Sequence, residues 1–192
     1  MTAKRATILE IGPGDDPLIS DRSVPGSDWL PYDTQEGEYT CVQPLSWRGY
    51  YRIGDAIRQL PRVTVIDSMV EDIDMSVFAG RFAEVYARNV LCDPGVAAGP
   101  ILNAASLLVE CGGTISFLDI ATPEYAPSRD ELSRFMGDRA CTMTQWLVAS
   151  SPDVTADQWC GPVGRYARSA RHGVFDGYAD LKARFVQFTK QA

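Results

Sequence analysis

Two closely spaced glycines at the end of an apolar run are the first residues that could support chemistry. Residues 6–11 are apolar and rich in β-branched side chains, and the run stops at Gly12-Pro-Gly14-Asp15. Because glycine has no Cβ, backbone amides in such a turn can approach a bound carboxylate or ribose closely. The segment from Glu10 to Asp15 therefore predicts either a ligand-binding loop or a tight turn without a ligand.

The spacing disfavours a dinucleotide at this turn. A G-x-G-x-x-G fingerprint that begins at Gly12 needs a third glycine at position 17, where the chain has Pro17. The same proline argues against the phosphate-binding glycine loop of a nucleotide-sugar enzyme. NAD, FAD and nucleotide sugars are disfavoured as ligands.

His172 is the only histidine, and so the only imidazole that could act as a general base. It lies in His172-Gly-Val-Phe-Asp-Gly177, whose glycines favour a turn between two strands. It could take a proton from an oxygen or nitrogen nucleophile. The alternative is a solvated histidine in a surface loop.

The cysteines indicate neither a metal site nor a disulfide framework. The five cysteines are odd in number and widely spaced, and no C-x-x-C pair occurs. The aspartates do not cluster with an asparagine in the way that a metal-dependent catechol-type site requires. We expect no metal, and reduced thiols fit a cytoplasmic protein.

Composition and charge restrict the partners. The 192 residues are 45% hydrophobic and 22% charged, as in an ordinary globular protein, and they fit one domain over 1–192. A net charge of -7 disfavours nucleic acid, because affinity for phosphates depends on clustered Lys and Arg. No apolar stretch approaches the ~20 residues of a membrane span, and no apolar signal region opens the chain, so we expect no membrane partner.

Strands and helices are expected to alternate along the chain. Proline and glycine punctuation predicts a loop over residues 13–37. Apolar runs predict strands at residues 6–12, 38–43, 62–66, 81–87, 114–120, 165–170 and 183–189. Helical spacing predicts helices at residues 51–60, 99–110 and 128–149, the last with Ser128 as N-cap and Glu131 completing a capping box. The alternation predicts a parallel α/β sheet covered on both faces, closed by an antiparallel pair of strands.

Three segments, in order, resemble motifs of the class I S-adenosylmethionine-dependent methyltransferases. They are Ile8-Leu-Glu-Ile-Gly-Pro-Gly-Asp15, Ala83-Glu-Val-Tyr-Ala-Arg-Asn-Val-Leu91 and Leu107-Leu-Val-Glu-Cys-Gly-Gly-Thr-Ile-Ser-Phe-Leu118. The resemblance implies a Rossmann-like three-layer sandwich. Its seven-stranded, mostly parallel sheet would have the order 3-2-1-4-5-7-6 and an antiparallel last strand.

The resemblance also implies site residues. Those matching the loop around the methionine part of S-adenosylmethionine are Glu10, Gly12, Gly14 and Asp15. Those matching the adenine contacts after the third strand are Asp67, Ser68 and Met69; the alternative for them is a surface loop. Those at the end of the fourth strand, beside the reactive methyl group, are Ala87, Arg88 and Asn89; the alternative for Arg88 and Asn89 is helix capping or a surface ion pair.

Two features depart from the family pattern. The family ends its second strand with Asp or Glu, which accepts hydrogen bonds from both ribose hydroxyls, whereas this chain has Gln43. The stretch after Gly14 is also rich in proline where most members have a helix.

The resemblance implies a methyltransferase that acts on a small molecule or a peptide group by O- or N-methylation. The alternative is a non-catalytic interaction module with weak or no cofactor binding.

A cluster of aromatic residues follows the predicted ligand-binding loop in the sequence. Its members, all within 23 residues, are Trp29, Tyr32, Trp47, Tyr50 and Tyr51. Such a cluster fills a core or lines an apolar pocket. The chain begins at the first strand without the amino-terminal helices of many members, so a partner subunit in a homo-oligomer could supply the lid.

Overall fold

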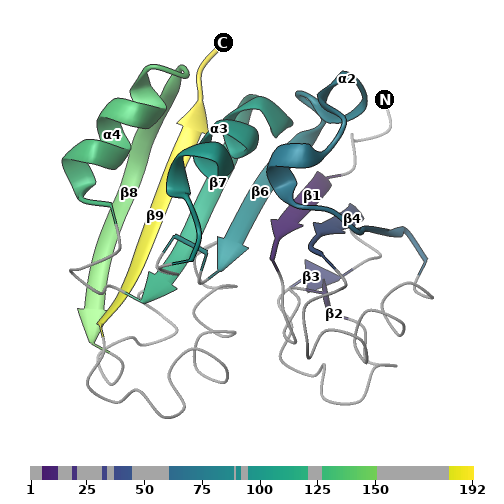
Figure 1. Ribbon diagram of the computed structural model, residues 1–192, viewed down its shortest axis with the longest axis horizontal. Coiled ribbons are helices and arrows are strands. Elements are labelled where there is room, and N and C mark those ends of the chain that lie inside the picture. Colours follow the sequence, from purple (N-terminus) through teal and green to yellow (C-terminus); the bar gives the residue numbers. More distant parts are fainter. Residues whose placement is uncertain are drawn as a thin grey trace.

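A seven-stranded sheet forms the centre of the computed structural model, which describes residues 6–12, 19–20, 32–33, 37–44, 61–88, 90–91, 95–120, 127–150 and 182–192. Its order is β5-β4-β1-β6-β7-β9-β8 (Figure 1). The strands are β1 (Ala6–Ile11), β4 (Gly37–Val42), β5 (Val63–Ile66), β6 (Phe82–Arg88), β7 (Val109–Ile120), β8 (Cys141–Ser150) and β9 (Lys182–Lys190). Two short strands, β2 (Ile19–Ser20) and β3 (Tyr32–Asp33), pair separately.

Only the last strand runs against the others. The neighbours from β5 to β7 are parallel, whereas β9 is antiparallel to both β7 and β8. The central strand β1 pairs on both sides, with Ile8 opposite Tyr39 of β4 and Glu84 of β6. The predicted Rossmann-like α/β fold is therefore confirmed in its strand order and in its reversed last strand.

The described helices lie on one face of the sheet (Figure 1). They are the 3-10 helix η1 (Val70–Asp72), α2 (Met75–Phe78), α3 (Ala98–Leu108) and α4 (Arg129–Gly137). In α3 the apolar spacing puts Ile101, Leu102, Ala105 and Leu108 on the side that faces the sheet, each at most 3% exposed. Burying a Leu or Ile side chain stabilises a fold by about 1.5–3 kcal/mol, so this face of α3 fixes the helix over β6 and β7.

The segment Cys111-Gly-Gly113 was predicted to end a helix. It lies instead inside β7, where the pairing with β6 is irregular. This strand begins at Val109, directly after α3, and its register against β6 shifts near Phe82. A Cβ on Gly113 would lie 2.7 Å from the carbonyl oxygen of Ala83, and Gly112 has φ +81°. The glycines therefore permit a close approach between two strands, which the sequence pattern presents as a turn.

The predicted helix over residues 128–149 is wrong in its second half. Its start is confirmed: the Ser128 hydroxyl accepts a hydrogen bond from the Glu131 amide at 3.3 Å, and the Ser128 amide donates to the Glu131 carboxylate at 2.8 Å. The helix α4 ends at Gly137, and after a left-handed residue at Ala140 the chain forms β8. The segment 141–150 is rich in β-branched and aromatic residues, and pairing with β9 stabilises it as a strand.

The strand β8 thus takes the place that was predicted for residues 165–170. Those residues, the predicted helix at 51–60 and most of the predicted loop at 13–37 lie outside the described residues. The prediction of a strand at 183–189 is confirmed as β9. Within the described ranges no helix has both the length and the apolarity needed to cross a membrane.

Candidate functional site

The carboxyl ends of β1 and β6 form the switch point of the sheet. From β1 the chain builds β4 and β5 on one side, and then crosses to β6 on the other side of β1. In open α/β sheets, ligands bind outside the carboxyl ends of the strands at the point where the strand order reverses. The candidate site therefore begins at the residue that follows β1.

Gly12 occupies this position in a left-handed conformation. Its φ is +60°, and its amide donates a hydrogen bond of 3.0 Å to the carbonyl oxygen of Val42 at the end of β4. A Cβ built on Gly12 would lie 3.4 Å from Cγ2 of Val90, in the segment after β6. Only glycine adopts this turn without strain, so the backbone conformation itself accounts for the residue type.

Glu10 is completely buried on the face of β1 that points away from α3. Leu9 and Ile11 pack into the core beneath the helices, so Glu10 between them projects to the opposite face. The hydroxyl of Tyr39, on β4, donates a hydrogen bond to the Glu10 carboxylate. This bond holds the carboxyl group two residues before the Gly12 turn.

Gln43 lies beside Gly12 at the same edge of the sheet. It follows β4 directly, and its amide donates a 3.1 Å hydrogen bond to the carbonyl oxygen of Ile66 at the end of β5. Its side chain is buried, with 5% exposed. The structure therefore brings Gly12 and Gln43 together on adjacent strand ends.

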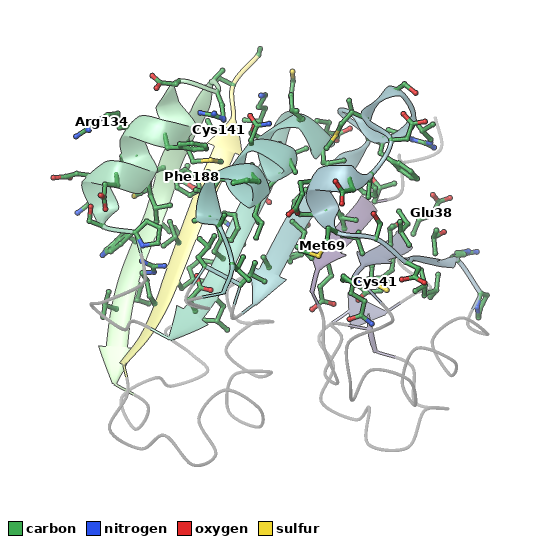
Figure 2. All side chains as sticks on the ribbon, in the orientation of Figure 1. Glu38, Cys41, Met69, Arg134, Cys141 and Phe188 are labelled. Atoms are coloured by element: carbon green, nitrogen blue, oxygen red, sulfur yellow. The ribbon has the colours of Figure 1, made fainter. Side chains whose placement is uncertain are left out.

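The three residues after β5 are less enclosed. Asp67 is exposed, and Ser68 and Met69 are half-buried, with the Ser68 hydroxyl donating a 3.0 Å hydrogen bond to the carbonyl oxygen of Met69. Figure 2 shows Met69 in the half of the molecule that contains β1 and β4. These residues follow the strand next to β4, at the same edge as Gly12 and Gln43.

The end of β6 borders the other side of the turn. Ala87 is buried and pairs with Ile11 of β1 and Phe117 of β7. Arg88 is the last residue of β6, and its side chain lies outside the described part of the chain, as do Gly14, Asp15, Asn89 and His172. The roles of all these residues stay predictions.

A buried ion pair beside this edge was missed by sequence reasoning. One carboxylate oxygen of Asp119, near the end of β7, accepts hydrogen bonds of 3.0 Å from the amides of both Val90 and Leu91. The other faces the Arg184 guanidinium of β9 at 3.4 Å. Complete burial raises the pKa of Asp119, and the Arg184 charge and the two amides oppose this rise. The signal that the sequence offered for this pair was one charged residue within each of two apolar runs, Asp119 and Arg184.

Solved methyltransferases share this fold at low sequence identity. The 16S rRNA (adenine(1408)-N(1))-methyltransferase from Catenulisporales acidiphilia, solved with its cosubstrate SAM, has a TM-score of 0.64 and 10% identity over 97% of this chain and 86% of its own. The 1,6-didemethyltoxoflavin-N1-methyltransferase of Burkholderia thailandensis, solved with S-adenosylhomocysteine, has a TM-score of 0.59 and 14% identity over 98% and 72%.

The same fold also occurs in a protein with another activity. The [4+2]-cyclase SpnF has a TM-score of 0.62 and 13% identity over 100% of this chain and 76% of its own. No protein-family model and no curated protein matches the sequence. The structural likenesses show that the chain has the class I methyltransferase fold.

Proposed function

We propose that this protein binds S-adenosylmethionine at the carboxyl edge of β1 and transfers its methyl group to an oxygen or nitrogen atom of a small molecule or a peptide group. The observation that carries the proposal is the left-handed turn at Gly12, at the point where the strand order reverses. Two methyltransferases of the same fold were solved with SAM or S-adenosylhomocysteine, which supports this choice of ligand.

The described residues fit this cofactor at adjacent strand ends. In this proposal the loop that starts at Gly12 holds the methionine part of the cofactor, and its further members Gly14 and Asp15 lie outside the described residues. The Gln43 side chain, buried beside Gly12, serves as the ribose contact. The adenine contacts are Asp67, Ser68 and Met69.

The main contribution of the protein to methyl transfer is to align the methyl group with the acceptor atom. When bound, the cofactor supplies an electrophilic methyl group on a sulfonium, with a neutral thioether as leaving group. Ala87 forms a small, buried wall at the end of β6, while Arg88 and Asn89 orient the acceptor beside it. His172 takes the proton from the attacking atom. Alignment of this kind contributes roughly 7–11 kcal/mol to lowering a barrier.

Calorimetric titration of the purified protein tests the proposal. We expect saturable, one-to-one binding of both S-adenosylmethionine and S-adenosylhomocysteine. NAD serves as the control, because Pro17 removes the third glycine of a dinucleotide loop. A protein that binds neither sulfur compound contradicts the proposal.

A second candidate function is a non-catalytic interaction module on the methyltransferase fold. It is favoured by Gln43, a neutral side chain where the family places a carboxylate. The fold by itself does not determine the reaction, and the SpnF cyclase is one example of another activity on it. This candidate predicts the absence of cofactor binding in the same titration.

A further inference from the structure

The segment that follows β6 is held by a single buried carboxylate. The Asp119 side chain is 0% exposed, and one of its oxygens accepts hydrogen bonds from two consecutive backbone amides, those of Val90 and Leu91. A carboxylate that receives two amide hydrogen bonds fixes the direction of both peptide groups. Leu91 itself is 2% exposed and belongs to the apolar core. This short segment is therefore fixed by its backbone as well as by its side chain.

The partner of this carboxylate joins a further part of the chain. Arg184 lies opposite Asp119 in the antiparallel ladder of β7 and β9, and its guanidinium also donates a 2.5 Å hydrogen bond to the carbonyl oxygen of Pro127, just before α4. The guanidinium carbon is 5.6 Å from the centre of the Trp146 ring on β8. The pair thus connects the segment after β6 to both β9 and the start of α4.

Stability alone does not explain a buried ion pair. Removing two charges from water costs several kcal/mol per ion, and apolar residues of similar volume commonly stabilise a core equally well. An apolar pair, however, cannot accept hydrogen bonds from the amides of Val90 and Leu91. The particular contribution of Asp119 and Arg184 is therefore the position of this segment.

That position matters at the candidate site, because Val90 lies next to the Gly12 turn. The Val90 side chain lies 3.4 Å from the point that a Cβ on Gly12 would occupy. A series of neighbouring residues therefore runs from Arg184 through Asp119 and Val90 to Gly12. It links the segment after β6 to the turn after β1, next to the last paired residues of these two strands, Ile11 and Ala87.

We infer that Asp119 and Arg184 form a positioning pair that holds Val90 against the Gly12 turn and thereby keeps the edge between β1 and β6 in the form that binds the cofactor. The inference rests on the proposed function, since it assigns these two residues to the same site. Neither residue contacts the ligand; both act through the backbone of Val90 and Leu91.

The test combines hydrogen exchange with titration of S-adenosylhomocysteine. The double variant Asp119→Leu/Arg184→Met removes the amide acceptor and both charges, and Asp119→Asn keeps an oxygen acceptor but removes the negative charge. The matched control is Ser116→Ala, because Ser116 accepts a 3.1 Å hydrogen bond from Gln187 across the same two strands, on the opposite face. The double variant keeps the test informative even where loss of one charged partner prevents folding.

In the double variant we expect the amides of Val90 and Leu91 to exchange at least about tenfold faster, while the amides of Ile115 and Phe117 in β7 keep their wild-type rates. We expect the dissociation constant for S-adenosylhomocysteine to rise at least about fivefold. Asp119→Asn should show smaller changes in the same direction, and Ser116→Ala should show neither change.

The outcomes separate this inference from the proposed function. Unchanged exchange at Val90 and Leu91, or faster exchange with unchanged affinity, overturns the positioning role while wild-type binding still supports the proposed function. Absence of binding by the wild type refutes the proposed function and, with it, the assignment of the pair to a cofactor site.

Discussion

The hydroxyl of Tyr39 donates a hydrogen bond to the completely buried carboxylate of Glu10, across the boundary between β4 and β1. The bond lies two residues before the Gly12 turn. It joins the two strands whose ends carry the predicted methionine and ribose contacts. The pair therefore lies in the same part of the sheet as the candidate site.

We predict that Tyr39→Phe lowers the free energy of unfolding by about 1.5–3 kcal/mol, because a buried carboxylate loses a hydrogen-bond donor. Tyr86→Phe is the matched control, since the Tyr86 hydroxyl donates to the half-buried Glu84 on the same face. Urea unfolding of both variants measures the difference. Equal losses in the two variants would contradict the structural importance of the buried pair.

We predict that Gln43→Glu strengthens S-adenosylmethionine binding about fivefold, or on the order of 1 kcal/mol. A charge-assisted hydrogen bond to the ribose contributes more than a neutral one. Because Gln43 is 5% exposed, the same change should lower the free energy of unfolding in the absence of ligand. Calorimetry and urea unfolding measure the two effects, and a variant whose affinity stays equal or falls shows that the ribose is held by another residue.

We predict that Gly113→Ala destabilises the protein by about 1–3 kcal/mol. The added methyl group would meet the Ala83 carbonyl oxygen at 2.7 Å, so β6 and β7 must separate. Gly137→Ala, with no heavy atom within 4 Å of the added carbon, is the control and should leave stability equal or slightly higher. Thermal unfolding of both variants is sufficient, and a stable Gly113→Ala protein would be incompatible with the close approach of these strands.

The capping box of α4 predicts a pH-dependent contribution to stability. Hydrogen bonds from the Ser128 amide and hydroxyl hold the pKa of the exposed Glu131 below its ordinary value. Since the pKa is lower in the folded state, the stabilisation is present above the pKa of the unfolded chain and is lost as the pH falls through the folded pKa. Urea unfolding between neutral and acidic pH should therefore show a smaller loss for Glu131→Gln than for the wild type. Parallel curves would contradict the capping interaction.

The local signals in the sequence predict the start of α4 better than its end. The capping box at Ser128 predicts where α4 begins, because all its hydrogen bonds lie within one helical turn. The end of that helix depends on β8 pairing with β9, for example Thr142 with Thr189, across a separation that no local pattern contains. The prediction of a long helix failed for this reason.

In the candidate site, too, residues fixed by local structure could be predicted, whereas residues that depend on long-range pairing could not. Gly12 could be predicted because its backbone conformation restricts the residue type directly. Asp119 and Arg184 could not, because they are 65 residues apart and only the antiparallel register of β7 and β9 makes them neighbours. The strand order came from the resemblance between motifs, since composition and periodicity give strands but not their order.

Titration of S-adenosylhomocysteine into the wild type, Gly12→Ala and Gly80→Ala tests whether the turn after β1 binds the cofactor. Gly12 and Gly80 have φ values of +60° and +64°, so alanine costs about 1–2 kcal/mol of backbone strain at either position. Only Gly12 lies at the carboxyl end of β1; Gly80 precedes β6, at the opposite edge of the sheet. We predict wild-type affinity for Gly80→Ala and binding at least about tenfold weaker for Gly12→Ala. Wild-type affinity in Gly12→Ala would contradict the assignment of this turn to the cofactor.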